Sequence, residues 1–208
     1  MYSAIHLVST ILSIANIAKF ALSNKKHKQM SATKWVVDPT HSEVQFKIKH
    51  LVISTVTGSF NKFEGKALTK AEEDFENADI DFSIDVDSIH TNQAQRDDHL
   101  RNSDFFEAST YPKINFKSTS FKKNGNGNYK LAGDLTLKGV TKPVELDVEF
   151  GGAAKDHYGN YKSGFEVTGK INRKEFGLTY NALTETGGLA LGEDVKLIAN
   201  LQLVKQAS

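Results

Sequence analysis

The sequence contains no cysteine, which removes disulfide bonds, thiolate nucleophiles and cysteine-ligated zinc sites together. It also lacks a glycine-rich phosphate loop, a Gly-x-Ser-x-Gly nucleophile motif and the histidine spacing typical of zinc enzymes. A formal net charge of +1 gives no support for a nucleic-acid-binding surface. We therefore expect no metal and no cofactor. With 39% hydrophobic and 25% charged residues, the chain has the composition of an ordinary globular protein.

Residues 1–29 differ from the remainder of the chain. Residues 4–22 are mostly apolar, and four lysines with no acidic residue give the segment a charge of +4. The rest of the chain is therefore mildly acidic. Any basic contact with a membrane or nucleic acid would have to come from this N-terminal extension.

Three interpretations of residues 1–29 remain open, and they place the protein in different compartments. If translation starts at Met30, the protein is cytoplasmic. If residues 1–23 act as a signal peptide, it is periplasmic, although no Lys or Arg precedes the apolar core. A membrane anchor is the third interpretation, but Asn16 and Lys19 interrupt the apolar stretch. In each case residues 30–208 form one domain.

From Trp35 onward apolar and polar residues alternate, which is typical of β-strands with one buried face. About eight such segments follow one another, each polar on one side. This pattern predicts an all-β fold, a single antiparallel sheet closed into a barrel. The clear strand segments are 43–49, 79–87, 144–150, 165–171 and 195–203, and the weaker ones are 56–68, 113–121 and 129–137.

Turns rich in glycine and asparagine separate the segments. Residues 124–128 are the strongest hairpin signal, and Gly151-Gly152, residues 158–160 and Gly187-Gly188 predict further turns. Residues 92–106 contain no β-branched residue and no alternation. We expect them to form a short helix across one end of the barrel.

The inward-facing residues decide what the barrel holds. An eight-stranded barrel either fills with side chains or encloses one small ligand. Small inward residues (Gly65, Ala67, Gly133 and Gly169) favour free volume, although they would also relieve curvature in a packed core. An apolar lumen selects an apolar chain over a sugar or nucleotide. The residues predicted to contact such a chain are Val44, Phe46, Ile48, Phe82, Ile84, Val86, Ile114, Phe116, Leu135, Leu137, Val144, Leu146, Phe165, Val167, Ile171, Phe176, Leu197 and Leu201.

Several short motifs occur in a fixed order along the chain. They are Asp38-Pro39-Thr40-His41-Ser42, Arg96-Asp97-Asp98-His99-Leu100-Arg101, Asp104-Phe105-Phe106, Tyr111-Pro112, Gly133-Asp134-Leu135-Thr136-Leu137, Gly139-Val140-Thr141-Lys142-Pro143, Asn172-Arg173 and Phe176-Gly177-Leu178. Through these motifs the chain resembles the YceI-like family, the polyisoprenoid-binding proteins of bacteria, over nearly all of residues 34–206.

The resemblance implies an extended lipocalin-like barrel whose pore accepts a long polyprenyl chain. It carries no settled catalytic activity. A polyprenyl phosphate or quinone-like ligand would need a polar contact for its head group. Arg96, Arg101 and Arg173 are the predicted contacts, since arginine forms forked, charge-assisted hydrogen bonds. The alternative is that these arginines only pair with neighbouring strands and loops.

Three functions follow from these observations. The first is a non-enzymatic lipid-binding protein that sequesters, transports or stores an isoprenoid chain. The second is an enzyme acting on such a lipid through His99 with Asp97 or Asp98. The third is a partner-binding scaffold with a packed core. Expected partners are a long-chain lipid, with transient membrane contact and a homodimer as further possibilities, and no nucleic acid.

Overall fold

The computed structural model describes residues 32–71, 74–125, 127–182 and 190–207. The N-terminal extension and the turn predicted at Gly187-Gly188 lie outside the described residues. The strands of the described chain are β1 (Thr33–Val37), β2 (Glu43–His50), β3 (Ser54–Phe60), β4 (Phe63–Thr69), β5 (Asp79–Asp85), β6 (Ile89–His90), β7 (Lys113–Lys123), β8 (Asn128–Leu137), β9 (Val140–Lys155), β10 (Tyr161–Asn172) and β11 (Leu191–Lys205).

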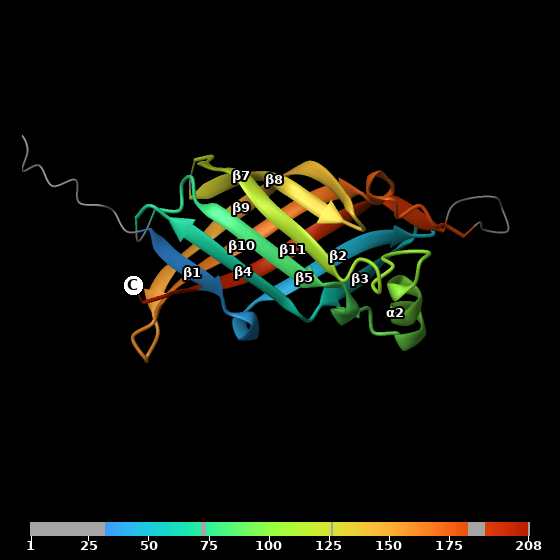
Figure 1. Ribbon diagram of the computed structural model, residues 1–208, viewed down its shortest axis with the longest axis horizontal. Coiled ribbons are helices and arrows are strands. Elements are labelled where there is room, and N and C mark those ends of the chain that lie inside the picture. The colour runs from blue at the N-terminus through green and yellow to red at the C-terminus, as the bar shows by residue number, and fades with distance from the viewer. Residues whose placement is uncertain (1–31, 72–73, 126, 183–189, 208) are drawn as a thin grey trace, which may run out of the picture. The chain divides into compact units, whose positions relative to one another are not determined.

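These strands form one antiparallel sheet that closes on itself (Figure 1). The last strand, β11, pairs with β10 along one edge and with both β1 and β2 along the other. The β1–β2 segment is one bent strand, interrupted by a 3₁₀ turn at Pro39–His41. The β3–β4 segment, interrupted at residues 61–62, is another. Counted in this way, the described chain forms an eight-stranded barrel, and the predicted fold is confirmed.

A short helix, α2 (Ala94–Arg101), lies at one end of the barrel, as predicted (Figure 1). The buried Asp97 carboxylate accepts hydrogen bonds from Thr91 N at 2.9 Å and Thr91 Oγ1 at 2.5 Å. The Arg101 guanidinium donates to the carbonyls of Asp87 and Ile89, both at 3.1 Å. These bonds tie the helix to β6 and to the residues on either side of it, and β6 pairs with β3 at the same end.

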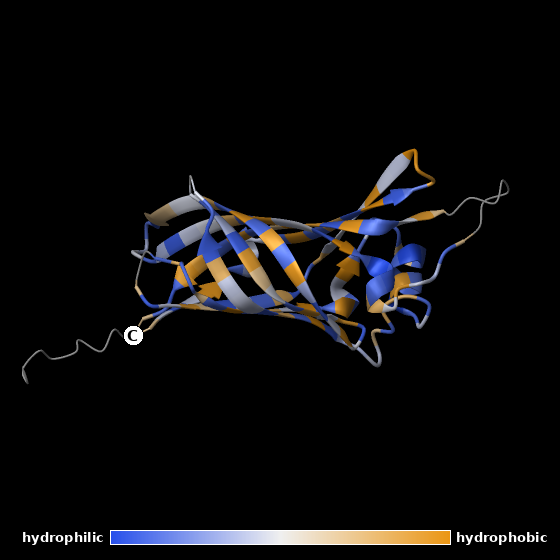
Figure 2. Ribbon diagram, turned by 90° about the horizontal axis from the view of Figure 1, so that it is seen from above, coloured by the Kyte–Doolittle hydropathy of each residue, from blue (hydrophilic) through white to orange (hydrophobic). Residues whose placement is uncertain are grey.

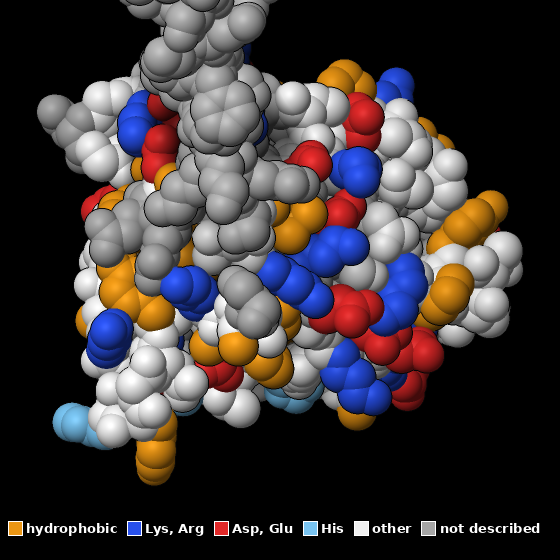
Figure 3. Space-filling model, turned by 60° about the vertical axis from the view of Figure 1, so that its left-hand side comes forward, with side chains coloured by type: hydrophobic (Ala, Val, Ile, Leu, Met, Phe, Trp, Pro, Cys, Tyr) orange, Lys and Arg blue, Asp and Glu red, His pale blue; other side chains and the backbone are white. Residues whose placement is uncertain are grey.

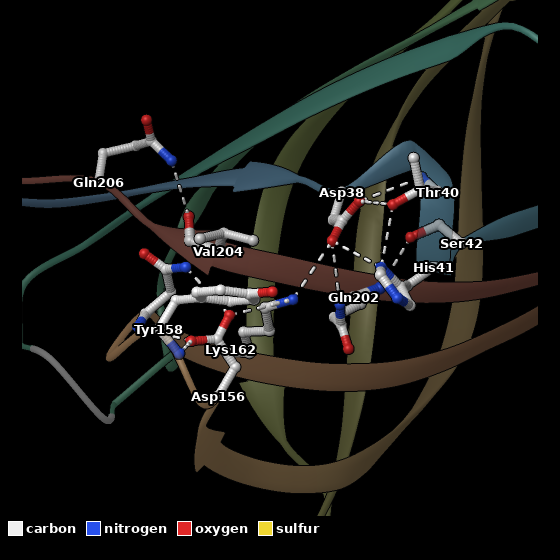
Figure 4. Close-up of polar contacts among 11 residues, drawn as sticks. Asp38, Thr40, His41, Ser42, Asp156, Tyr158, Lys162, Gln202, Val204 and Gln206 are labelled. Atoms are coloured by element: carbon white, nitrogen blue, oxygen red, sulfur yellow. Dashed lines mark hydrogen bonds and ion pairs between the residues drawn. The ribbon is translucent and has the colours of Figure 1, made fainter.

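A polar network holds the bend between β1 and β2 against β10 and β11 (Figure 4). The Asp38 carboxylate accepts hydrogen bonds from Thr40 Oγ1 at 2.6 Å, His41 Nδ1 at 2.9 Å and Gln202 Nε2 at 3.1 Å. Lys162 Nζ lies 3.5 Å from it. The hydrogen bond from Thr40 is the main reason that the pKa of Asp38 lies well below its ordinary value, with a further contribution from His41.

The structure confirms one of the predicted turns and contradicts another. Asn124 and Asn128 are joined by a backbone hydrogen bond of 2.8 Å between β7 and β8, as the hairpin prediction requires. The prediction of a turn at Gly151-Gly152 was wrong, because both residues lie inside the 16-residue strand β9. They stand beside a register shift in the β9–β10 pairing, and Gly152 has a φ of +108°. The glycines therefore accommodate a β-bulge.

The outer surface of the barrel is charged and mixed in sign. On the face that Figure 3 shows, lysines lie side by side with aspartates and glutamates. Ion pairs between exposed side chains of the described residues include Lys130 with Asp147 at 2.7 Å and Lys123 with Asp74 at 2.9 Å. No helix within the described ranges is long and apolar enough to cross a membrane.

Candidate functional site: an apolar cavity in the barrel

The barrel encloses a cavity of about 550 Å³. Most of its wall is made by inward-facing residues of the strands, and Figure 2 shows the alternation of hydrophobic and hydrophilic residues along them. Val195, Leu197, Ala199 and Leu201 of β11 point inward, yet each remains partly accessible. Side chains in a filled core would be fully buried. The lumen is therefore not packed, which argues against the packed-scaffold interpretation.

An aromatic cluster closes the barrel end opposite α2. Phe75, from the β4–β5 connection, is 2% exposed and its ring centroid lies 4.8 Å from that of Phe165 and 5.0 Å from that of Trp35. Phe150 packs against Phe165 at 5.2 Å. These four rings are not part of the cavity wall, which ends at residues such as Ile80 and Val167 that pack against the cluster. The cavity is blind at this end.

The other end of the cavity lies beside α2 and carries its polar lining. Gln93, Tyr180 and Ala182 line the cavity and are also exposed to solvent, so this end forms the mouth. His99 lies in the rim. Its Nε2 is 2.9 Å from Asp104 Oδ2, and its ring packs edge-on against Tyr180 at 5.0 Å. A ligand with an apolar tail and a polar head would therefore have its head at this end.

Two of the three predicted head-group arginines line the cavity. Arg96 lines the cavity, and its Nε and Nη2 donate to Thr91, whereas its Nη1 has no hydrogen-bond partner in the described part of the chain. Arg101 is not part of the wall. Its guanidinium binds the backbone of Asp87 and Ile89 and the Asp98 carboxylate at 2.9 Å. For Arg101 the geometry matches the alternative of a purely structural role.

The Arg173 guanidinium binds backbone carbonyls through two of its nitrogens and leaves the third without a partner in the described chain. It is 2% exposed, and it donates to the carbonyls of Gly192 at 2.8 Å, Tyr180 at 2.8 Å and Leu178. Its Nη2 is buried without a hydrogen-bond partner among the described residues. Burial lowers the pKa of Arg173 from its ordinary value. A buried donor without a partner is costly, and an acceptor on a ligand in the cavity would satisfy it.

The predicted apolar contacts fall largely on the cavity wall. All of them except Val86, Phe165 and Phe176 line it. Phe165 belongs to the aromatic cluster, and the other two are buried in the core around the mouth. The predicted contacts omitted further wall residues, of which Ile80, Val195, Ile198 and Ala199 lie within the clear alternating segments. The others come from weaker strands and from connections: Val56, Phe60, Leu100, Phe105, Phe106, Leu131, Leu178, Tyr180 and Leu191. Among the residues from connections, the Phe105-Phe106 pair at the end of the predicted helical segment is an apolar signal that the sequence shows.

The small inward residues do not leave the free volume that the sequence suggested. A Cβ atom at Gly58 would lie 2.3 Å from Phe46 Cζ, and one at Gly133 would lie 2.4 Å from Phe116 Cζ. At Gly169 the close neighbour is Leu146 Cδ2, at 2.3 Å. At each of these glycines, a large side chain from the adjacent strand occupies the space that a Cβ atom would need. That side chain lies flat on the barrel wall. The glycines widen the lumen indirectly, because these side chains do not project toward the barrel axis.

The residues of the enzymatic alternative do not meet. Asp97 contacts Thr91 and lies 3.4 Å from His90 Nδ1, whereas His99 pairs with Asp104. Asp98 pairs with Arg101. Within the described ranges, no group of three potential ligands is placed to hold a metal ion.

A closed antiparallel barrel with a blind apolar cavity and a polar mouth defines a lipocalin-like binding fold. Comparison with known sequences and structures assigns the chain to one family of such proteins. The sequence model of the YceI-like domain matches residues 35–203, and the chain belongs to the YceI-like family.

Relatives from two bacteria support this assignment. A UPF0312 protein of Staphylococcus aureus is 40% identical over 171 residues, which cover 82% of this chain and 96% of the relative. A UPF0312 protein of Pectobacterium atrosepticum is 37% identical over 201 residues, covering 96% of this chain and 99% of the relative.

Solved structures share the fold. The YceI protein of Campylobacter jejuni is 34% identical, with a TM-score of 0.65 over 77% of this chain and 91% of that one. A polyisoprenoid-binding domain from Saccharophagus degradans, implicated in plant cell wall breakdown, has a TM-score of 0.58 at 16% identity. It covers 83% of this chain and 98% of its own, and at this identity the likeness concerns the fold alone.

Proposed function

We propose that this protein binds a long apolar chain of the isoprenoid type in its barrel and sequesters, transports or stores it without changing it chemically. The observation that carries the proposal is the blind cavity of about 550 Å³, whose wall is apolar except at the mouth. Transfer of a hydrocarbon chain from water into such a cavity is favourable, whereas the polar groups of a polar ligand would lose their hydrogen bonds to water without replacement. The description of the Saccharophagus domain as polyisoprenoid-binding supports the same ligand class.

The head group of the ligand is proposed to sit at the mouth, near Arg96 and Arg173. Nη1 of Arg96 and Nη2 of Arg173 have no hydrogen-bond partner in the described chain, and both residues line the cavity. A phosphate or quinone oxygen would accept from these donors. Among the described residues, no carboxylate forms an ion pair with either guanidinium, so both remain free to pair with an anionic head group.

Mass spectrometry of the organic extract from gently purified full-length protein tests the proposal. A near-stoichiometric polyprenyl species or quinone is the expected result. Recovery of the extracted lipid in unchanged form supports a carrier, and turnover of added lipid would instead support the enzymatic alternative. If no lipid is extracted and none binds when supplied, the proposal is wrong.

A matched pair of variants locates the ligand. Ala199 faces the cavity and the next residue, Asn200, is exposed on the outside of the same strand. Ala199→Trp should abolish uptake of a polyprenol because the indole fills the lumen, and Asn200→Trp should leave uptake unchanged. Equal uptake by both variants would place the ligand elsewhere.

The head-group site is tested with two probes that share one tail. Arg96→Gln should weaken retention of a polyprenyl phosphate and leave retention of the uncharged polyprenol unchanged, since only the phosphate needs the charge. If both probes are affected equally, Arg96 acts through the structure of the rim. Arg173 is less suitable for this test because three backbone carbonyls depend on its guanidinium.

A further inference from the structure

The turn between β2 and β3 exposes large apolar side chains. Val52 is 84% and Ile53 is 87% exposed, and the adjacent Leu51 is 40% exposed. Solvated turns ordinarily carry glycine, asparagine or other polar residues instead. Contiguous apolar side chains that stand out into solvent are typical of an interaction site.

The backbone of this turn is strained as well. Leu51 has a φ of +51° and Val52 a φ of +64°, both in the left-handed region. That region disfavours every residue with a Cβ atom, and a β-branched valine most of all. Both the composition and the conformation of the turn are therefore unfavourable in water. This cost is understandable if the exposed side chains have a partner.

The turn belongs to the mouth of the cavity. It projects at the same end as α2 (Figures 1 and 2). Leu51 N donates to the Ala190 carbonyl at 2.8 Å, and both Ala190 and His50 line the cavity. A partner that contacts the tip of the turn lies directly beside the opening through which an apolar chain enters.

The strands next to the turn carry a row of exposed lysines. Lys47 and Lys49 lie on the outside of β2, and Lys196 of β11 is directly opposite Lys47. Like charges that lie directly opposite each other on neighbouring strands repel. None of the three lysines has an ion pair in the described part of the chain, whereas Lys170 and Lys174 nearby are paired with Asp194 and Glu193. The row is thus complementary to a negatively charged surface.

We propose that the β2–β3 turn docks the mouth of the barrel onto an anionic lipid bilayer. Val52 and Ile53 enter the boundary between head groups and acyl chains, and Lys47, Lys49 and Lys196 contact the anionic head groups. A second copy of the chain is the weaker alternative, because three residues at the tip of one turn provide far less than the roughly 1,000 Å² that a stable protein interface buries. This docking site would be the place where the protein exchanges its lipid with a membrane. The proposal therefore rests on the proposed function.

Vesicle binding by the full-length protein tests the docking site. Vesicles of phosphatidylcholine alone are compared with vesicles of phosphatidylcholine and phosphatidylglycerol in a flotation assay. Val52→Gly with Ile53→Ser should weaken binding to the anionic vesicles by about tenfold or more. Glycine tolerates the positive φ at position 52, so this variant should fold at least as well as the wild type.

Two further variants complete the design. Tyr158→Asp removes an apolar side chain that is 92% exposed in the β9–β10 turn at the opposite end of the barrel, and it should bind vesicles like the wild type. Replacing Lys47, Lys49 and Lys196 with glutamine should weaken anionic binding by about fivefold for each lysine, with a smaller dependence on salt. Wild-type vesicle binding by the Val52→Gly, Ile53→Ser variant would overturn the proposal.

Uptake of a polyprenol from detergent separates this proposal from the function on which it rests. The turn variant should still take up the polyprenol from detergent micelles but acquire it more slowly from vesicles. If the wild type binds vesicles through the turn yet holds no polyprenol, the proposed function fails and the docking site stands. If sedimentation velocity shows that the turn variant loses only self-association, the occupant is a second copy and the membrane proposal is wrong.

Discussion

The ring of Phe82 fills the space in front of Gly65 on the neighbouring strand. A Cβ atom at Gly65 would lie 2.5 Å from Phe82 Cδ2 and 2.8 Å from Val37 Cγ2. The two residues are direct partners in the β4–β5 register. Similar contacts join Gly58 with Phe46 and Gly133 with Phe116, so the barrel wall repeatedly uses a glycine to let a phenylalanine lie flat.

Gly65→Ala should therefore reduce both stability and ligand capacity. The new methyl group forces the Phe82 ring from the wall toward the lumen, and the overpacking costs about 2 kcal/mol of unfolding free energy. Urea unfolding and polyprenol titration measure the two effects. Gly164→Ala is the matched control, because a Cβ atom there would meet nothing within 4 Å. Equal behaviour of the two variants would contradict this account of the wall.

Phe75→Ala should open the closed end of the barrel. Removing this ring leaves Trp35 and Phe165 without their shared neighbour and lowers the unfolding free energy by about 4 kcal/mol. Trp35 is the single tryptophan of the sequence and is 0% exposed, so its fluorescence should shift to longer wavelength in the variant. An unchanged emission spectrum would mean that other side chains close the gap.

Asp38→Asn should destabilise the bend between β1 and β2. The carboxylate accepts from Thr40, His41 and Gln202, and hydrogen bonds to a charged group contribute about 2 kcal/mol in favourable cases. The unfolding free energy at neutral pH should fall by about that amount. Thr40→Val provides a graded comparison, since it removes the hydroxyl donor that contributes most to the lowered pKa of Asp38.

The same substitution should change the pH dependence of stability. The pKa of Asp38 is lower in the folded protein than in the unfolded chain, so the unfolded state takes up the proton first as the pH falls. The stabilisation is complete above the ordinary aspartate pKa of about 3.9 and is lost progressively below it. The difference between wild type and Asp38→Asn should therefore shrink below about pH 4. A difference that stays constant down to pH 2 or so would contradict this assignment.

Ser163→Ala should stabilise the protein. Ser163 is 1% exposed and its hydroxyl has no hydrogen-bond partner in the described chain. Burial of an unsatisfied polar group is unfavourable, so its removal should raise the unfolding free energy by about 1 kcal/mol. Thermal or urea unfolding measures the change. A loss of stability would show that the hydroxyl has a partner, such as a buried water.

The barrel was predictable because alternation is a local property. In β2 and β11, the alternating apolar residues 44, 46 and 48 and 195, 197, 199 and 201 line the cavity, and this pattern is visible without knowledge of the strand order. The lining from irregular segments was not predictable in this way. Phe105, Leu178 and Tyr180 reach the cavity only because the chain folds the 86–112 and 173–182 segments over the same end of the barrel.

The closed end escaped prediction for a similar reason. Phe75 lies in a connection between strands, where no periodicity identifies it, and its contact with Trp35 joins residues 40 positions apart. Gly151-Gly152 was misjudged because a glycine pair serves a β-bulge as well as a turn, and only the pairing partners decide between them. The small inward residues were misjudged because their neighbours across the sheet, not the barrel axis, take up the space they vacate.

Because the cavity is closed at one end, a long ligand can enter and leave the barrel in only one order. Entry and exit share one opening, so the tail goes in first and comes out last. With its head group at the rim next to Arg96, as proposed above, the ligand would present that head group first to an acceptor. A protein or membrane that receives the cargo is therefore presented with the chemistry of the head before any of the tail leaves the barrel.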